Sequence, residues 1–216
     1  MNRYNFIAFL ICMFITGCGS HNIKKESPAA TIAAKKHSNR KILIQPLDDI
    51  GENVIAFLDS NIARYYKATI SVLPARRIPA SAWYAPRHRF RADKILAFLR
   101  TFARAADTYV IGVTGKDIST SNGANPDWGV MGLGYQPGSC CVVSDYRLNK
   151  YPQSEWELHS KLLKVAIHEL GHNFGLPHCP NEQCLMTDAK GKDRLNHEKD
   201  FCPKCAAYLH SGGFLK

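Results

Sequence analysis

The sequence predicts a mixed α/β (α+β) fold, a compact single domain in which helices pack on a twisted, mixed β-sheet. Strand-like and helix-like segments alternate between residues 41 and 144, one long helical pattern follows them, and a loop-rich C-terminal end carries four cysteines. With 216 residues, of which 45% are hydrophobic and 21% charged, the chain has the size and composition of one globular domain.

The N-terminal end is expected to lie outside this domain. Arg3 precedes an apolar run at residues 6–15, which is too short to span a bilayer comfortably but is typical of a secretory signal. The stretch Ile15-Thr-Gly-Cys18 resembles the lipobox of bacterial lipoproteins, in which the cysteine carries the lipid. An uncleaved membrane anchor with a chance cysteine is the alternative.

These features set the expected boundaries. We expect a signal peptide at 1–17, a lipidated N-terminus and flexible tether at 18–40, and the folded domain at 41–216. The sequence therefore predicts an exported lipoprotein, anchored to a membrane of a bacterial cell envelope through the lipid on Cys18.

The formal net charge of +10 is not a nucleic-acid signal. Residues 41–216 hold 22 Lys and Arg against 17 Asp and Glu, without a basic run interleaved with aromatic residues. Arg87, Arg89 and Arg91 alternate with other residues just before a predicted helix and are expected to lie in a solvated loop. We expect a monomer with no nucleic-acid partner.

Hydrophobic periodicity assigns the first regular elements. Lys41–Pro46 and Ile70–Leu73 are apolar stretches of strand length, and Thr108–Thr114 is rich in β-branched residues and predicts a buried strand. Apolar residues recur at helical spacing in Val54–Tyr66 and Asp93–Ala106, which predicts two helices.

A loop and an edge strand are expected next. Gly115–Trp128 is rich in Gly, Asn, Pro and Asp, which is typical of a loop. The glycine-rich segment Gly129–Gly138 leads into Cys140–Ser144, which predicts an edge strand. Because side chains alternate between the two faces of a strand, at most one of Cys140 and Cys141 is expected in the core.

A long helix is predicted to end at about Phe174. Ser154 and Glu157 have the spacing of a capping box at its start, and Gly175 can end it in a left-handed turn. This helix carries the sequence His168-Glu-Leu-Gly-His172. Residues four apart lie on the same helix face, so both imidazoles can reach one metal ion.

The residues around this pair complete a catalytic metal site. After the turn at Gly175, His178 can swing back as a third ligand, and three neutral imidazoles leave one position of a tetrahedral Zn²⁺ ion open for water. Glu169 lies about 100° around the helix from His168, outside the ligand set but close enough to take a proton from that water. The pattern predicts hydrolysis with Glu169 as general base.

The motif continues into a cysteine pattern that identifies a family resemblance. His168-Glu-Leu-Gly-His-Asn-Phe-Gly-Leu-Pro-His-Cys179 is followed by Cys184-Leu-Met186 and by Cys202-Pro-Lys-Cys205. This resembles the archaemetzincin (archaelysin) family of metzincin zinc metalloproteases, strongly in the C-terminal third and more weakly over 41–216. The resemblance implies a compact metzincin-like catalytic domain and a Met-turn at Met186 beneath the catalytic zinc. It also implies a second, structural zinc held by Cys179, Cys184, Cys202 and Cys205.

The cysteine spacings alone leave two possibilities open. Cys-x4-Cys and Cys-x2-Cys are zinc-ligand spacings, and a Cys₄ site would close the loop-rich C-terminal end. Two disulfides are the alternative, which an oxidising exterior would favour. Zinc is the preferred interpretation.

The predicted function is that of a zinc-dependent peptidase acting on peptide or protein substrates. Gly129–Val143 is expected to pair with an extended substrate, because edge strands bind peptides through main-chain hydrogen bonds. Two alternatives are a membrane-anchored zinc-binding or interaction module without turnover and a DNA-associated zinc protein. Glu169 argues against the module, because a purely binding site has no use for a carboxylate at that position.

Overall fold

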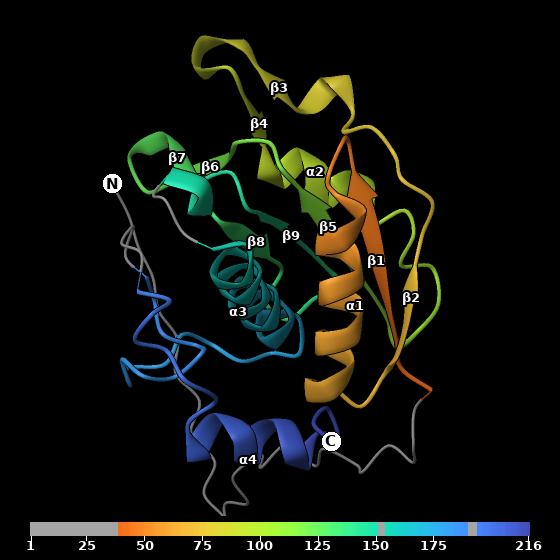
Figure 1. The fold of residues 1–216 in the computed structure, drawn as a ribbon, viewed down its shortest axis with the longest axis vertical. Coiled ribbons are helices and arrows are strands. Elements are labelled where there is room, and N and C mark those ends of the chain that lie inside the picture. The colour runs from red at the N-terminus through yellow and green to blue at the C-terminus, as the bar shows by residue number, and fades with distance from the viewer. Residues whose placement is uncertain (1–38, 151–153, 190–193) are drawn as a thin grey trace, which may run out of the picture. The chain divides into compact units, whose positions relative to one another are not determined.

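Two β-sheets organise the chain in a computed structural model that describes residues 39–150, 154–189 and 194–216 (Figure 1). The predictions for the signal peptide and for Cys18 fall outside these residues. Among the residues described, no helix is long and apolar enough to cross a bilayer.

The larger sheet has the strand order β2-β1-β5-β9-β8. Its strands are β1 (Lys41–Leu47), β2 (Thr69–Val72), β5 (Thr108–Thr114), β8 (Gly132–Gly134) and β9 (Cys140–Ser144). The first four in this order run parallel, and β8 is added antiparallel to β9. The predicted strands at 41–46, 70–73 and 108–114 are therefore confirmed. The prediction that 140–144 forms the edge is wrong, because the edge strand is β8.

The smaller sheet has the order β3-β4-β6-β7. It contains β3 (Trp83–Tyr84), β4 (Arg89–Arg91), β6 (Ile118–Asn122) and β7 (Asn125–Val130). The prediction of a loop over 115–128 is wrong, because β6 and β7 form a hairpin that turns at Gly123, where φ is +55°. The outer half of this hairpin is polar and exposed, so it lacks the hydrophobic alternation that marks a half-buried strand.

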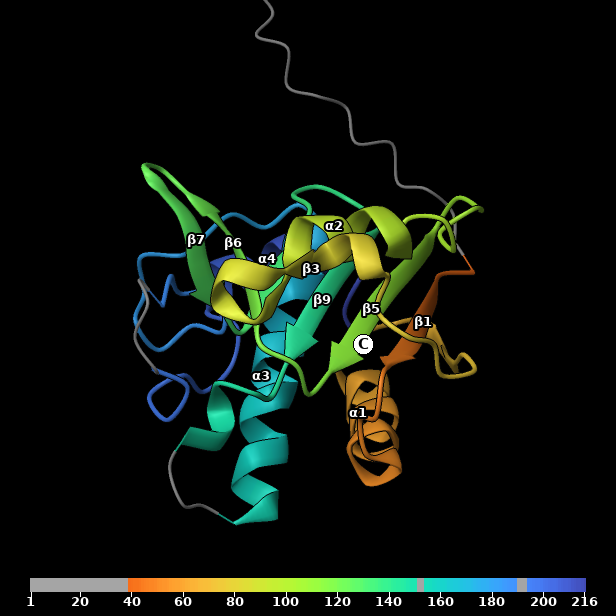
Figure 2. The same cartoon turned by 90° about the horizontal axis from the view of Figure 1, so that it is seen from above.

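Helices cover both faces of the larger sheet (Figures 1 and 2). The α-helices of the described residues are α1 (Glu52–Tyr65), α2 (Ala92–Leu99), α3 (Glu155–Asn173) and α4 (Pro203–Ser211), of which the first three pack on this sheet. Figure 2 shows α1 and α3 on one side of the sheet and α2 on the other. The predicted helix over 93–106 stops at Leu99, because Thr101 and Phe102 donate to carbonyls three residues back and tighten the chain into turns.

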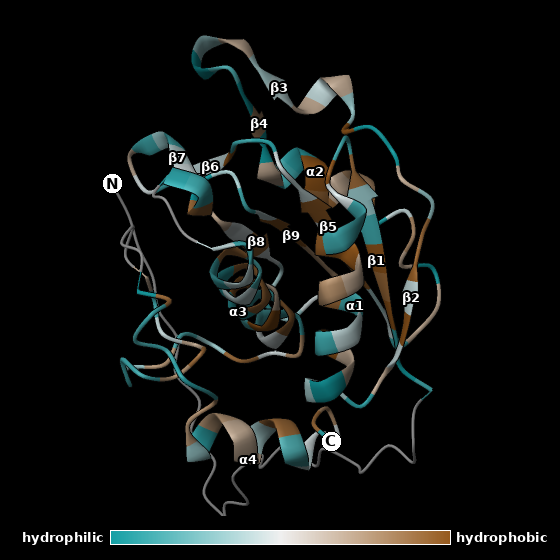
Figure 3. Ribbon diagram, in the orientation of Figure 1, coloured by the Kyte–Doolittle hydropathy of each residue, from teal (hydrophilic) through white to brown (hydrophobic). Residues whose placement is uncertain are grey.

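The sheet separates two hydrophobic cores. Cys141 belongs to the core shared with α1 and α3, and Cys140 belongs to the core beneath α2. Both thiols are fully buried, so the expectation that at most one lies in the core is wrong. β9 is an interior strand covered on both faces, and such strands are apolar throughout. Figure 3 shows that β1 and β5 are mainly hydrophobic, whereas α1 also carries hydrophilic residues.

Candidate active site

The active-site helix is fixed at its N-terminus by the predicted capping box. The Ser154 hydroxyl accepts a hydrogen bond from the Glu157 N–H at 3.2 Å, and the Glu157 carboxylate accepts one from the Ser154 N–H at 2.9 Å. The helix ends at Asn173, and the chain then reverses at Gly175, where φ is +99°. The turn sends the following residues back along the helix.

Three histidines meet beside this turn. His168 and His172 come from α3 and His178 from the segment after Gly175, and their ligand nitrogens lie within 4.8 Å of one another. Nδ1 of His168 lies 2.6 Å from the Leu185 carbonyl oxygen, and Nδ1 of His172 lies 2.7 Å from that of Leu176. Donation of the Nδ1 proton to these carbonyls leaves Nε2 of each ring unprotonated, as a metal ligand must be.

Burial favours the neutral form of the His168 and His172 imidazoles. Burial lowers the pKa of His168 to about 3, and burial likewise lowers the pKa of His172. His178 is more open, with a half-exposed side chain whose Nδ1 lies 4.0 Å from Asp188. Three imidazole nitrogens gathered at one point fit a zinc ion.

Glu169 lies beside this cluster and against the edge strand β8. It is 7% exposed, and burial raises its pKa to about 8. A Cβ on Gly132 would lie 2.6 Å from one carboxylate oxygen of Glu169, and a Cβ on Gly134 would lie 3.1 Å from the other. The glycines of β8 therefore leave the space that the Glu169 side chain occupies.

A cleft of about 580 Å³ runs along these groups. Its lining includes Glu169, the three histidines, β8 and part of the β6–β7 hairpin. Met186 is fully buried in the core that contains α3, and its sulfur lies against Gly171 of that helix. The arrangement combines a place for a metal ion, a carboxylate next to it and an open sheet edge in one groove.

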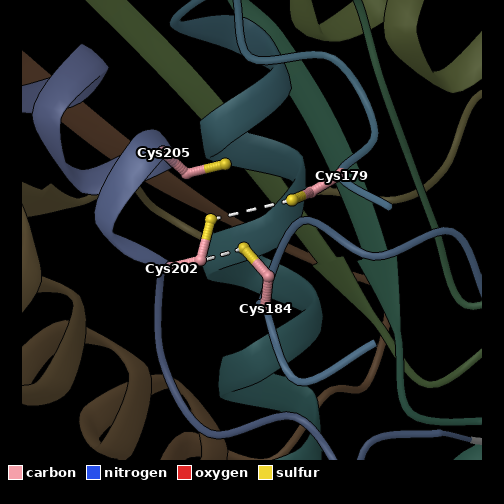
Figure 4. Close-up of side chains that lie close together, drawn as sticks. All are labelled: Cys179, Cys184, Cys202 and Cys205. Carbon is pink, nitrogen blue, oxygen red and sulfur yellow. Dashed lines mark hydrogen bonds between the residues drawn. The ribbon is translucent and has the colours of Figure 1, made fainter. Parts of the chain in front are cut away.

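The four C-terminal cysteines form a second cluster (Figure 4). The sulfur atoms of Cys179, Cys184, Cys202 and Cys205 lie within 4.8 Å of one another. Those of Cys179 and Cys202 are 3.7 Å apart, far beyond the roughly 2.05 Å of a disulfide bond. Backbone N–H groups of Met186 and Cys202 point at the Cys184 sulfur, at 3.5 and 3.3 Å.

The thiols of this cluster differ in acidity, because burial raises the pKa of Cys184 and of Cys205 whereas that of Cys202 is lowered. Burial opposes ionisation of Cys202, but hydrogen bonds from the Cys205 backbone and from neighbouring thiols lower the Cys202 pKa to about 7. Four soft sulfur donors, of which that of Cys184 accepts two backbone N–H groups, fit a zinc site.

Sequence reasoning missed Asn173. Its side-chain amide donates to the Tyr135 carbonyl at 2.8 Å and to the Cys140 carbonyl at 2.9 Å, and the residue is 2% exposed. These carbonyls flank the connection between β8 and β9, so Asn173 ties the edge strand to the end of α3. An asparagine at a helix end has many uses, and no sequence signal distinguishes this one.

Comparison with known proteins agrees with the site. The model of peptidase family M54 matches residues 33–211. The archaemetzincin of Archaeoglobus fulgidus is 31% identical over 171 residues, which cover 78% of this chain and 98% of the relative. The archaemetzincin of Pyrococcus furiosus is 34% identical over 158 residues, which cover 67% and 79%.

Solved structures show the same fold. The crystal structure of the Archaeoglobus fulgidus archaemetzincin complexed with malonate has a TM-score of 0.66 and 30% identity, and the match covers 78% of this chain and 99% of that chain. The archaemetzincin of Methanopyrus kandleri has a TM-score of 0.66 and 26% identity, with 81% and 95% covered. The chain therefore belongs to peptidase family M54, the archaemetzincins, and is a zinc metallopeptidase.

Proposed function

We propose that His168, His172 and His178 hold the catalytic zinc and that Glu169 is the general base for peptide-bond hydrolysis. One observation carries the assignment: three ligand nitrogens lie within 4.8 Å of one another, and the buried carboxylate of Glu169, from the same helix as two of them, lies against the edge strand β8. When bound, zinc polarises a carbonyl and makes a water molecule more acidic.

Glu169 then acts twice. Its carboxylate accepts a proton from the attacking water, and the same carboxyl group passes that proton to the departing amine. The nearby glycines leave it room to lie along β8, where the substrate backbone is expected. No side chain of the site forms a covalent bond to the substrate in this scheme.

We propose that β8 binds the substrate backbone. It is the last strand of its sheet and pairs only with β9 among the described strands, so its outer edge can hydrogen-bond to an extended peptide. Two of its residues are Gly132 and Gly134, which let another backbone approach closely. The substrate-binding edge is therefore shorter than the segment Gly129–Val143 that the sequence predicts, because β8 has three residues.

We propose that Cys179, Cys184, Cys202 and Cys205 hold a second, structural zinc. The cluster joins the segment that follows α3 to α4, because Cys179 comes directly after His178 and Cys205 lies in α4. A zinc ion here would fix the segment that contains both His178 and Met186, and Met186 would act as the Met-turn of the site.

We propose that the chain is exported and attached to a membrane through a lipid on Cys18. The support is the short apolar run and the stretch Ile15-Thr-Gly-Cys18. Mass spectrometry of the membrane-extracted protein should find diacylglycerol on Cys18, and Cys18→Ser should release the protein from the membrane fraction. An unmodified Cys18 behind an intact N-terminus would refute the proposal.

Glu169→Ala tests the catalytic assignment. The variant should bind as much zinc as the wild type, measured by atomic absorption, and lose peptide cleavage by at least about a hundredfold, within the range of general-base contributions. His159→Ala, on α3 but outside the cluster, is the matched control and should keep cleavage. A non-catalytic binding module would show no cleavage in the wild type either.

A further inference from the structure

An ion-pair network lies next to the catalytic cleft, where a solvated loop was expected. Arg89 and Arg91 of β4 have side chains only 16% and 17% exposed. Arg89 lies 3.2 Å from Asp117 and 3.6 Å from Asp127, and Arg91 lies 3.8 Å from Asp127. The sequence prediction is wrong because it could not know that the β6–β7 hairpin brings these two carboxylates beside β4.

Arg147 connects this network to the cleft. Its Nη2 lies 2.9 Å and 3.1 Å from the two carboxylate oxygens of Asp117. The guanidinium lies flat against Gly129, where a Cβ would come within 1.9 Å of Nη2. Arg147 lines the cleft and its side chain is 23% exposed. Within the residues described, its Nη1 makes no hydrogen bond or ion pair.

The network carries more positive than negative charge. Four guanidinium groups (Arg87, Arg89, Arg91 and Arg147) face three carboxylates, those of Asp93, Asp117 and Asp127. Lys150 adds another positive charge to the lining near Arg147. The carboxylates of the lining other than Glu169, those of Asp188 and Glu198, come from the segment after Met186, and that of Asp188 lies 4.0 Å from His178. The wall at Arg147 is therefore suited to an anion.

The glycines of this wall set the place of that anion along a substrate. Gly132 lies against Glu169 and Gly129 lies against Arg147, three residues earlier. Extended chains rise about 3.3 Å per residue, so the two points are separated by at most about 10 Å. A peptide that pairs antiparallel with β8 runs toward Gly129 as it proceeds to its C-terminus. Arg147 then faces the second or third residue after the scissile bond.

We propose that Arg147 selects substrates with an acidic side chain at this position, which it binds through Nη1 while Nη2 remains paired with Asp117. The inference rests on the proposed function, since it takes β8 as the substrate-binding edge. Nη1 offers its N–H donors to the substrate carboxylate, and the pairing of Nη2 with Asp117 holds the guanidinium in place, which reduces the entropy lost on binding.

The test measures binding to the full-length chain carrying Glu169→Ala, so that labelled peptides are not cleaved. Each peptide is a labelled decapeptide of otherwise uncharged residues that carries one Glu or one Gln, and the position of that residue is varied across the series. The protein is titrated into each peptide, and binding is measured by fluorescence anisotropy. Glu should bind about fivefold more tightly than Gln at one or two adjacent positions, as a partly exposed charge-assisted hydrogen bond allows. Adding Arg147→Gln should abolish the preference.

Matched variants separate Arg147 from general charge effects. Arg87→Gln removes one charge of the same network outside the cleft and should keep the fivefold preference. If Arg147→Gln does not fold, binding is measured with Arg147→Lys instead. This variant should reduce the preference for Glu to about twofold, because an ammonium group cannot hold the carboxylates of Asp117 and of the substrate in one plane. Equal binding of Glu and Gln at every position, or a preference that survives both Arg147 variants, overturns the proposal.

Cleavage by the zinc-loaded wild type tests the proposed function separately. Cleavage without a Glu preference in binding refutes the role of Arg147 and leaves the peptidase assignment intact. A Glu preference in binding without cleavage refutes the catalytic assignment and supports the role of Arg147. If the protein both cleaves peptides and prefers Glu, the preferred Glu should lie on the C-terminal side of the scissile bond. A preferred Glu on the N-terminal side would overturn the inferred position of Arg147 along the substrate.

Discussion

Gly171 and Met186 are packed so closely that a methyl group on Gly171 would lie 2.5 Å from the Met186 sulfur. Gly171 precedes His172 on α3, and Met186 is fully buried two residues after Cys184. The helix that supplies two histidines therefore rests directly on the segment held by the cysteine cluster. The shape of the metal site depends on this contact.

Gly171→Ala should displace Met186 and weaken zinc binding. Overpacking a buried site costs about 1–3 kcal/mol, and the higher helix propensity of alanine returns about 1 kcal/mol. The net loss of stability should be about 1 kcal/mol, whereas the tilt imposed on the two helical histidines should reduce zinc affinity at least about tenfold. Competition with a fluorescent chelator measures the affinity.

The control for this variant is Gly115→Ala. A Cβ at Gly115 meets Asp145 at an ordinary 3.5 Å, so zinc affinity should not change. Unchanged zinc affinity in Gly171→Ala would show that Met186 can move without disturbing the histidines.

Gly132→Ala should reduce cleavage while zinc stays bound. The new methyl group would lie 2.6–2.9 Å from three side-chain atoms of Glu169, which would have to turn away from the substrate edge. A general base accelerates the reaction about a hundredfold or more, and its displacement loses part of that acceleration, so kcat should fall at least about tenfold. Peptide kinetics and zinc content are measured on the same sample, and a normal kcat would contradict the packing argument.

The parts of the site that sequence could predict are those that lie within one element. The four-residue spacing of His168 and His172 fixes their common face, and the capping box fixes where the helix starts. His178 could be added because Gly175 supplies a turn. Contacts between elements could not be predicted, because Gly132 meets Glu169 only once β8 is known to be the sheet edge.

The fold follows the same division. The buried strands β1 and β5 can be recognised in the sequence by their apolar residues. Strands β6 and β7 cannot, because they pair through their backbones and carry polar side chains at the turn. The ion pairs of Arg89 depend on that hairpin. Because the sequence predicts a loop over 115–128 instead of the hairpin, it also wrongly predicts that Arg89 is solvated.

Asn173→Ala should weaken substrate binding more than chemistry. The change leaves the carbonyls of Tyr135 and Cys140 without the amide that binds them, at a cost of about 1–3 kcal/mol in unfolding free energy. Because β8 would be less firmly held, KM should rise more than kcat falls. Asn61→Ala removes a similar hydrogen bond, from the Asn61 side-chain amide to the Phe57 carbonyl on α1, and should lower stability without changing KM.

Metal analysis should distinguish the two clusters. The purified wild type should contain about two zinc ions per chain, His178→Ala about one, and Cys205→Ser about one. The two losses should differ in consequence. His178→Ala should abolish cleavage with little change in melting temperature, because that ligand is half exposed, whereas Cys205→Ser should lower the melting temperature, because a structural zinc contributes directly to folding. About one zinc ion in the wild type, with no titratable thiols among the four cysteines, would replace the second zinc by two disulfides.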